Sequence, residues 1–443
     1  MKKICIGIIG FGTVGAGVAK ILIDNKEVIS ARAGAELSVK YIADLDITTD
    51  RGVDVNKNIL TTDAQQVLSD PDVDIIIELI GGKTIAKDFT LTAIKNGKHV
   101  VTANKALIAS FGKEIIEAAV NNSVDFGFEA SVAGCIPVIK SLKESLAGNN
   151  IASVSGILNG TCNYILSKIT NEGLAFDKVL ADAQAIGYAE ADPTLDIEGI
   201  DASHKLAIIM ALAYGMEINL DDIYVEGITG VTLEDIRHAE QLGYKVKLLA
   251  ISKKISDADG EEAIEARVHP TMIPFDNLFA SVNDSLNAID INGDAVGDMF
   301  LVGAGAGMMP TASAVVSDII DISRNILSCN SSQRVPILSY LPEKVKQIKV
   351  QPIEEIYSRY YFRFSVLDQP GVLSNISGVL GEHGISIKSV QQTEEREDKT
   401  VPIVMLTSLA KEANVKDAIS EINELDITTK ETVLIRIEEN IKL

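Results

Sequence analysis

The stretch KICIGIIGFGTVG, residues 3–15, decides the fold at the start of the chain. Its first eight residues form a short, Ile-rich apolar run, which is typical of a strand buried in a parallel sheet. The run leads into G-x-G-x-x-G and then into the helical pattern AGVAKILIDN. Between a strand and a helix, such glycines allow a tight turn and let the backbone approach a pyrophosphate. The stretch predicts dinucleotide binding, with contacts at Gly10, Phe11, Gly12, Thr13, Val14 and Gly15.

The next predicted strand, LSVKYIADLD, bears on which dinucleotide binds, because it ends in acidic residues. A carboxylate here, such as that of Asp44, suits the 2′-hydroxyl of NAD, whereas an arginine would suit the 2′-phosphate of NADP. Leu45 offers no cation, although Lys40 or Lys57 can still reach a phosphate. We expect NAD or NADP as the cofactor, with NAD favoured.

Two further strands are predicted at residues 74–82 and 98–104, with a helix between them. Parallel sheets bind ligands beyond the carboxyl ends of their strands. We therefore expect four residues that follow these strands to face the ligand: Gly81, Gly82, Asn104 and Lys105.

Composition limits the class of protein. The 443 residues suffice for two or three domains, and no apolar run approaches the length of a membrane helix. The net charge of −22 disfavours nucleic acid and anionic membranes as partners. The chain does not open on a signal-peptide pattern, so we predict a cytoplasmic protein. The four cysteines form no C-x2-C pair, which disfavours zinc and is typical of reduced thiols: Cys5, Cys135, Cys162 and Cys329.

The segment GYAEADPTLDIEGIDASHK, residues 187–205, concentrates ionisable side chains just before an apolar helix. Helical spacing puts Asp201 and Lys205 on one face, four residues apart. A carboxylate beside an ammonium can hold a proton donor in place and help to set its pKa. The plainer interpretation is a solvated first helical turn with an ion pair.

The order and spacing of seven residues in and just before this segment resemble the signature of homoserine dehydrogenase: Ala183, Gly187, Pro193, Asp196, Gly199, Asp201 and Lys205. The resemblance implies reversible reduction of L-aspartate 4-semialdehyde to L-homoserine with NAD(P)H. It also implies that Lys205 donates the proton and that Lys105, in NKAL, is a second active-site cation. Asp201 and Glu190 would hold the substrate, Asp196 would support them, and Gly187 would lie near the cofactor.

Two more segments are similar to that family. EASVAGCIP, residues 129–137, implies a monovalent cation, usually sodium, held chiefly by the backbone carbonyls of Glu129, Val132, Gly134 and Ile136. This chain has Cys135 where glycine is common, and the alternative is a plain turn between a strand and a helix. FLVGAGAGMMPTA, residues 300–312, reads as a glycine-rich turn before a long helix, and the resemblance implies a cofactor contact at Gly303.

After a predicted linker at 331–357, the chain shows the order βαββαβ, which is ferredoxin-like. D-x-P-G-V-L at 368–373 and HGISIKSV at 383–390 resemble the ACT domain, a module that often binds amino acids. The expected effector is threonine, bound at Asp368, Gly371, Val372 and Gly384. The alternative is a purely structural dimerisation module.

The predicted architecture is α/β, with three successive domains. A Rossmann doubly wound parallel sheet occupies residues 1–130, and an α+β catalytic and dimerisation domain follows at 131–305. Residues 306–330 form a helix that returns to the nucleotide domain, and 358–443 form the ACT domain. We expect a homodimer or homotetramer, without a fused aspartokinase. Two other classes remain open: a related amino-acid dehydrogenase with another substrate, and a catalytically silent amino-acid sensor.

Overall fold

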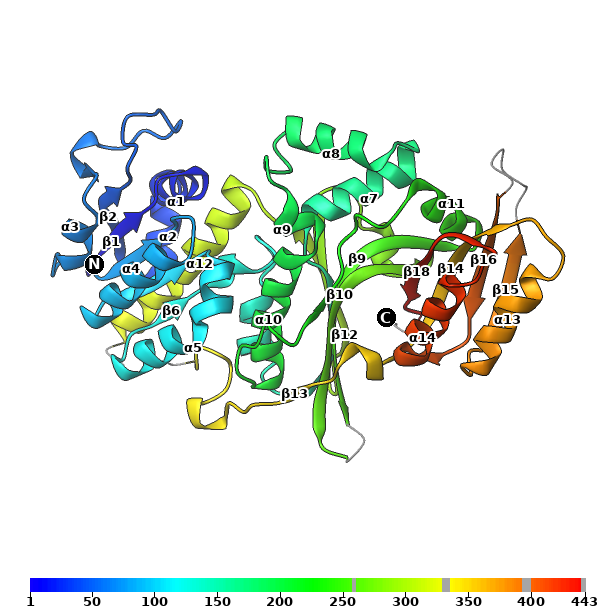
Figure 1. The fold of residues 1–443 in the computed structure, drawn as a ribbon. Helices are drawn as coiled ribbons and strands as arrows, with labels where there is room; N and C mark the ends of the chain where they lie inside the picture. Colours follow the sequence, from blue (N-terminus) through cyan, green and yellow to red (C-terminus); the bar gives the residue numbers. More distant parts are fainter. Residues whose placement is uncertain (257–259, 329–334, 393–399, 440–443) are drawn as a thin grey trace. The chain divides into compact units, whose positions relative to one another are not determined.

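The computed structural model describes residues 1–256, 260–328, 335–392 and 400–439 (Figure 1). The chain divides into two compact units, each built from three segments. Unit 1 contains Met1–Val154, His204–Asp221 and Asn287–Ile348, and unit 2 contains Ser155–Ser203, Asp222–Leu286 and Lys349–Leu443. Within the described ranges, no helix is long and apolar enough to cross a membrane.

Unit 1 is built on a six-stranded parallel sheet with the order β3-β2-β1-β4-β5-β6. This is the doubly wound order, so the predicted fold of the nucleotide domain is confirmed. Apolar residues of β1 alternate between the faces, and Ile4, Ile6 and Ile8 point into a cluster with α1 and α2. Strands and helices of this part have these bounds: β1 Lys3–Ile9, α1 Thr13–Asp24, α2 Lys26–Ala33, β2 Glu36–Ala43, β3 Leu60–Thr61, α3 Ala64–Ser69, β4 Ile75–Glu78, α4 Thr84–Lys95, β5 His99–Thr102, α5 Lys105–Asn121 and β6 Phe126–Gly127.

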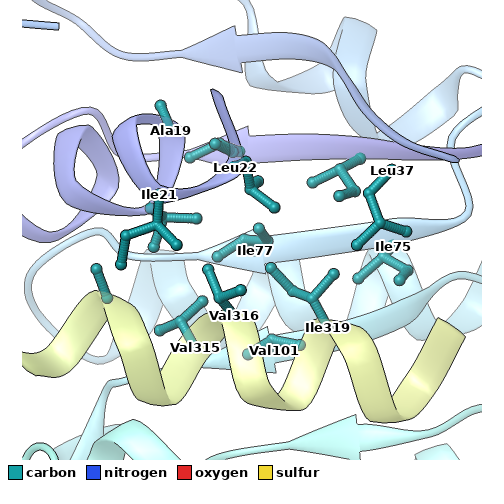
Figure 2. Close-up of a cluster of buried hydrophobic side chains, with 14 of the residues drawn as sticks. Ala19, Ile21, Leu22, Leu37, Ile75, Ile77, Val101, Val315, Val316 and Ile319 are labelled. Atoms are coloured by element: carbon teal, nitrogen blue, oxygen red, sulfur yellow. The ribbon is translucent and has the colours of Figure 1, made fainter. Parts of the chain in front are cut away.

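Helix α12, Met308–Leu327, completes this core although it lies some two hundred residues further along the chain. Figure 2 shows its side chains Val315, Val316 and Ile319 directed toward apolar residues of β4 and β5. Each such side chain taken out of water contributes about 1.5–3 kcal/mol. The helix approaches α1 so closely that a Cβ at Gly17 would lie 2.8 Å from the Met308 carbonyl oxygen.

The rest of unit 1 comes from segments that follow β6 in the chain. After β6 come the short 3-10 helix η2 (Glu129–Ser131), helix α6 (Val138–Lys140) and the π-helical turn η3 (Ser141–Ser145). Strands β11 (Leu286–Gly293) and β12 (Gly297–Ala304) precede α12, and most of α10 (Ile200–Tyr214) also belongs here.

Unit 2 combines a long hairpin with helices that precede it in the chain. Strands β9 (Tyr244–Ser256) and β10 (Glu262–Pro274) pair antiparallel over their full length, from Glu262↔Ser256 to Pro274↔Tyr244. The other elements are α7 Gly160–Glu172, α8 Phe176–Ala185, α9 Thr194–Ile197, β8 Tyr224–Val225 and α11 Leu233–Gln241. Strand β7, Ile151–Ile157, crosses the boundary between the units.

The C-terminal module has the predicted βαββαβ order and a four-stranded antiparallel sheet, β18-β14-β16-β15. Residues of α13 and α14 form one apolar cluster with this sheet. The ferredoxin-like fold is therefore confirmed. Its elements are β14 Tyr357–Leu367, α13 Val372–Glu382, β15 Ile387–Gln392, β16 Thr400–Thr407, α14 Glu412–Asn423 and β18 Thr428–Ile437.

The module's sheet is continuous with the long hairpin. Strand β18 pairs parallel with β10 at Thr271↔Arg436 and Met272↔Ile437. The short strands β8 and β13 (Lys349–Val350) also pair with β10. The C-terminal module is predicted as a separate domain, but this pairing joins it to the sheet of unit 2.

Several predicted boundaries are wrong at the strand ends. Strands β4 and β5 stop at Glu78 and Thr102, before the predicted ends. Helix α5 starts at Lys105, because the Asn104 side chain accepts a hydrogen bond from the Leu107 amide at 3.0 Å and caps the helix. Residues 300–304 form a strand rather than a turn, and the helix predicted after Pro137 is one short turn of α-helix followed by η3.

A buried carboxyl group lies where β4 ends. Glu78 is fully buried, and its oxygens accept hydrogen bonds from the Thr102 hydroxyl at 2.7 Å and the Ile80 amide at 2.8 Å. Desolvation outweighs these two donors and raises the pKa of Glu78 to about 7. Its folded-state pKa is therefore above the ordinary value of about 4.3 for an unfolded glutamate.

We predict that this carboxyl group makes stability fall as pH rises. The folded state binds the proton more tightly, so the stabilisation is complete below pH ~4.3 and is lost by pH ~7, a change of about 4 kcal/mol. Glu78→Gln should flatten this part of the dependence, whereas Glu27→Gln, exposed on α2, should leave it unchanged. Unfolding midpoints in urea between pH 4.5 and 8 test this. Equal slopes for Glu78→Gln and wild type would contradict it.

Candidate active site

The predicted site residues come from both units, and helix α10, which carries Asp201 and Lys205, crosses the boundary between the units. The glycine-rich turn in unit 1 joins β1 to α1. Gly10 has φ 104°, and a Cβ there would lie 2.6 Å from the Leu79 carbonyl oxygen. A Cβ at Gly15 would lie 2.0 Å from the Gly10 oxygen, so both positions require glycine. Gly12 precedes α1 and has open space around its Cβ position, which leaves the N-terminus of the helix accessible to an anion.

Asp44 follows β2, as the sequence predicts, and its carboxylate stabilises the glycine-rich turn. One oxygen accepts a hydrogen bond from the Phe11 amide at 2.5 Å, and the other accepts one from the Asp46 amide at 2.9 Å. Each oxygen keeps a further lone pair, so the carboxylate can still accept a hydroxyl donor.

Arg51, which is not among the predicted site residues, is a further cation in the segment after β2. Its Nη2 lies 3.1 Å from the Asp46 carboxylate, and its side chain is 28% exposed. Hydrogen bonds from Thr48 and Thr49 also hold that carboxylate and lower the pKa of Asp46. In the sequence, Arg51 stands five residues after Asp46. It is therefore not at the position next to Asp44, where an arginine is expected.

The loops after β4 and β5 lie together. The Asn104 side-chain amide donates to the Gly82 carbonyl oxygen at 2.7 Å, and its backbone amide donates to the Thr102 hydroxyl at 2.9 Å. Thr102 in turn binds Glu78, so this buried acid supports both loops. Lys105, at the first turn of α5, is half-buried.

The predicted cation loop makes two consecutive left-handed turns, at Ala133 (φ 53°) and Gly134 (φ 56°). A Cβ at Gly134 would lie 2.6 Å from the Gly305 carbonyl oxygen, so glycine is required. The Ile136 carbonyl oxygen accepts from the Val138 amide, while no backbone amide in the described ranges donates to the carbonyls of Val132 or Gly134. Those two carbonyl oxygens therefore keep lone pairs that a cation could use. Within the same ranges, no group of three or more His, Cys, Asp or Glu residues is arranged to hold a metal.

The Glu129 carboxylate is not available as a simple ligand. It accepts hydrogen bonds from the amides of Ile139 at 3.0 Å and Lys140 at 2.8 Å, at the start of α6. The Glu129 amide donates to Asp318 of α12 at 2.8 Å, and Lys140 lies 3.3 Å from that acid. Burial, with the nearby Asp318 charge, raises the pKa of Glu129 to about 7. The sequence does not predict this buried cluster of Glu129, Lys140 and Asp318.

Gly303 lies in β12 beside the same loop. A Cβ there would lie 2.9 Å from the Cys135 sulfur, and the Cys135 amide donates to the Ala304 carbonyl oxygen at 3.2 Å. The structure thus brings together two segments that the sequence singles out separately, residues 129–136 and the end of β12.

In unit 2, Asn159 brings two of the predicted acids together. Its side-chain nitrogen donates to Asp196 at 2.7 Å and to Asp201 at 2.8 Å. Its side-chain oxygen accepts from the Cys162 amide at 2.8 Å and caps α7. Asn159 is not among the site residues that the sequence predicts. The sequence signal for this role was the Asn-Gly pair before a helix. The side chain of an N-cap asparagine accepts a bond from the helix with its oxygen and can donate to other groups with its nitrogen.

The remaining residues of this group lie on the loop between α8 and α9. Glu190 is exposed, and its main-chain oxygen accepts a hydrogen bond from the Gln184 side chain at 3.1 Å. The Asn159 amide binds the carboxylates of Asp196 and Asp201 but not that of Glu190. Gly187 has φ 78° and is also exposed. The Thr161 hydroxyl donates to the Tyr188 carbonyl oxygen at 2.8 Å, which ties this loop to α7.

Helix α10 carries both Asp201 and Lys205, one turn apart as the sequence predicts. Their side chains are buried, with 4% and 7% of the residue surface exposed. The solvated-turn interpretation is therefore wrong for this helix. A buried lysine and a buried aspartate need partners, and both residues have them.

The predicted effector residues lie at the two ends of α13. Gly371 (φ 95°) precedes the first residue of the helix, Val372, and Asp368 is exposed just before it. Gly384 (φ 72°) follows the other end. An 11-residue helix is about 16 Å long, so the two ends do not form one small-molecule site within one copy of the module.

Three family models match this chain. The family model for homoserine dehydrogenase matches residues 137–320, that for its NAD-binding domain matches 10–129, and that for the ACT domain matches 360–426. A homoserine dehydrogenase of Neisseria gonorrhoeae is 45% identical over 99% of both chains.

Solved structures extend the likeness to the fold. A homoserine dehydrogenase from Thiobacillus denitrificans has a TM-score of 0.93 and 44% identity, with 99% of both chains covered. A hyperthermophilic archaeal homoserine dehydrogenase in complex with NADPH has a TM-score of 0.60 and 28% identity over 72% of this chain and 98% of its own. This chain therefore belongs to the homoserine dehydrogenase family of NAD(P)-dependent oxidoreductases and carries a C-terminal ACT domain.

Proposed function

We propose that Asp196 and Asp201 hold L-homoserine or L-aspartate 4-semialdehyde in this enzyme and that Lys205 moves the proton. The single observation that supports this most is the Asn159 bridge, which gathers two carboxylates around one amide. Two carboxylates match the ammonium group and hydroxyl of homoserine, because both are donors. Glu190, on the adjoining loop, completes the proposed set.

The bound nicotinamide supplies or accepts the hydride. Reduction of the aldehyde builds negative charge on its oxygen, and an ammonium group stabilises that charge and can donate a proton to it. Lys205 is the proposed donor and Lys105 the proposed second cation. Asp201, one turn before Lys205 on α10, holds the substrate and favours the charged form of nearby cations.

We propose Gly10–Gly15, Gly187 and Gly303 as cofactor contacts, with NAD favoured by the Asp44 carboxylate at the end of β2. The position of Arg51 supports some use of NADP, because a guanidinium binds phosphate well. The loop at Val132–Ile136 is the proposed site of a sodium ion. Binding of the ion would hold this loop against β12.

We also propose threonine as the ligand of the ACT domain, a homodimer or homotetramer as the assembly, and the cytoplasm as its location. The accessible N-terminus of α13 at Gly371 supports an amino-acid carboxylate there. The free thiols of Cys5, Cys135 and Cys162 agree with a reducing compartment, whereas Cys329 lies outside the described residues.

We predict that Lys205→Ala lowers kcat for homoserine oxidation by about 1,000-fold, because loss of a positioned proton donor typically costs 10²–10⁴. Lys178→Ala, an exposed lysine of α8, is the matched control and should retain wild-type turnover. Reduced cofactor is measured by its absorbance, and binding of NADH by its fluorescence. Lys205→Ala with near wild-type turnover would contradict the proposed role, as would equal losses in both variants.

We predict that Arg51→Ala lowers kcat/KM for NADP by about tenfold and leaves that for NAD unchanged. A charge-assisted hydrogen bond to phosphate contributes about 1.5–3 kcal/mol, and NAD lacks this phosphate. Steady-state kinetics with each cofactor, at saturating homoserine, measure the ratio. A similar decrease for both cofactors would show that Arg51 acts on the loop structure instead.

A further inference from the structure

We propose that Arg436 and Glu226 are positioning residues through which the ACT domain holds Asp196. The proposal rests on the role of Asp196 in binding substrate, given above. All the residues involved belong to unit 2. The connection passes from β18 of the ACT domain, through the segment after β8, to helix α9.

The first step is a buried arginine on β18. Arg436 is 2% exposed, and its guanidinium binds Glu412 of α14 through Nε at 3.0 Å. Its Nη1 lies 2.7 Å from Glu226, outside the ACT domain. The guanidinium also lies over the Tyr224 ring, 4.9 Å from the centroid, and the Tyr224 hydroxyl donates to Glu226 at 2.9 Å. One guanidinium thus joins an ACT helix to the end of β8.

Strand pairing fixes the position of Glu226 relative to this arginine. Strand β10 pairs with β18 at Thr271↔Arg436 and with β8 at Val268↔Val225. The Glu226 amide donates to the Val268 carbonyl oxygen at 2.8 Å. Both partners of the ion pair are therefore attached to the same strand, and their side chains meet beside it.

The second step runs from Glu226 to α9. The Ile228 amide donates to the carbonyl oxygen of Ile197, the last residue of α9, at 2.8 Å. A Cβ at Gly227 would lie 2.4 Å from that same oxygen, which leaves no space between the two segments. The Thr229 hydroxyl also donates to Glu198 at 3.3 Å. The residues after Glu226 therefore determine where α9 ends.

The third step is Asp196 itself, the residue before Ile197. Its carboxylate binds Asn159 at 2.7 Å, and its carbonyl oxygen accepts from the Cys162 thiol at 3.1 Å. A displacement of Ile197 therefore moves an acid of the proposed substrate site. From Arg436 to this acid, every step is a hydrogen bond, an ion pair or a peptide bond.

The ion pair that Arg363 makes with α11 lies further from α9 along the chain, because Glu234 is six residues from Ile228 whereas Glu226 is two residues from it. Arg363 of β14 binds Asp235 of α11 at 2.6 Å and lies 3.4 Å from Glu234. No hydrogen bond among the described residues joins α11 to α9. Glu234 is thus a close match for Glu226: each acid faces an ACT arginine, and their side chains are 36% and 35% exposed.

The test compares Glu226→Gln with Glu234→Gln in the full-length enzyme. Loss of one charged partner is expected to raise KM for homoserine about fivefold in Glu226→Gln, while kcat and KM for the cofactor stay near wild type. Glu226→Asp, which keeps the charge, should restore part of the loss. Glu234→Gln should behave as wild type. Equal effects of the two glutamine variants, or a Glu226→Gln enzyme with unchanged KM, would overturn the proposal.

Two further variants keep the outcome unambiguous. Gly227→Ala leaves the ion pair intact and presses directly on Ile197, so it should also raise KM for homoserine. If Glu226→Gln does not fold, this variant alone decides: an unchanged KM would overturn the connection. Asp196→Asn tests the role on which the proposal rests, since an unchanged KM there would contradict the proposed function rather than the connection to the ACT domain.

Threonine supplies the last readout. If threonine inhibits the wild-type enzyme, Glu226→Gln should shift the half-inhibitory concentration at least threefold, and Glu234→Gln should not. A wild-type enzyme that neither binds nor responds to threonine would contradict the proposed effector alone, because the effects on KM are measured without it. Inhibition that is identical in all three proteins, with an unchanged KM, would overturn the connection.

Discussion

The proposed substrate site depends on one carboxamide, that of Asn159. Two carboxylates in one partly buried place repel each other unless donors lie between them. Asn159 supplies both donors, at 2.7 Å to Asp196 and 2.8 Å to Asp201. The side chain cannot turn over without losing its bond to the Cys162 amide, so the start of α7 determines which way the amide points. A helix cap therefore orients the acids.

The two units hold their functional groups by different means. In unit 1, the glycine-rich turn, Asp44, Glu78 and Asn104 are linked by short hydrogen bonds at the carboxyl ends of neighbouring strands. In unit 2, α9 is held on one side by Asn159 and on the other by Ile228, next to a sheet that continues into the ACT domain. A regulatory domain joined by strand pairing can affect a site through small shifts, because a packed sheet transmits displacement.

Local patterns predicted much of this structure. The glycine-rich turn, the apolar strand before it and the βαββαβ order each lie within a short window, so apolar patterns and turn residues identified them. The roles of Asn159, Arg51 and Glu78 were missed because each depends on a partner brought near by folding. The pairing of β10 with β18 joins residues more than 160 positions apart, and no local signal indicates it. Resemblance to a family identified Asp196 and Asp201, but not the amide between them.

The most direct test of this account is the kinetics of Asn159→Asp with homoserine. The substitution keeps the size of the side chain and an oxygen to cap α7, but it replaces both donors with a third acid. The account predicts that kcat/KM for homoserine falls about 100-fold or more, while NADH binding is retained, because two charge-assisted hydrogen bonds are lost. A variant that oxidises homoserine as well as the wild-type enzyme would contradict the claim that this amide organises the site.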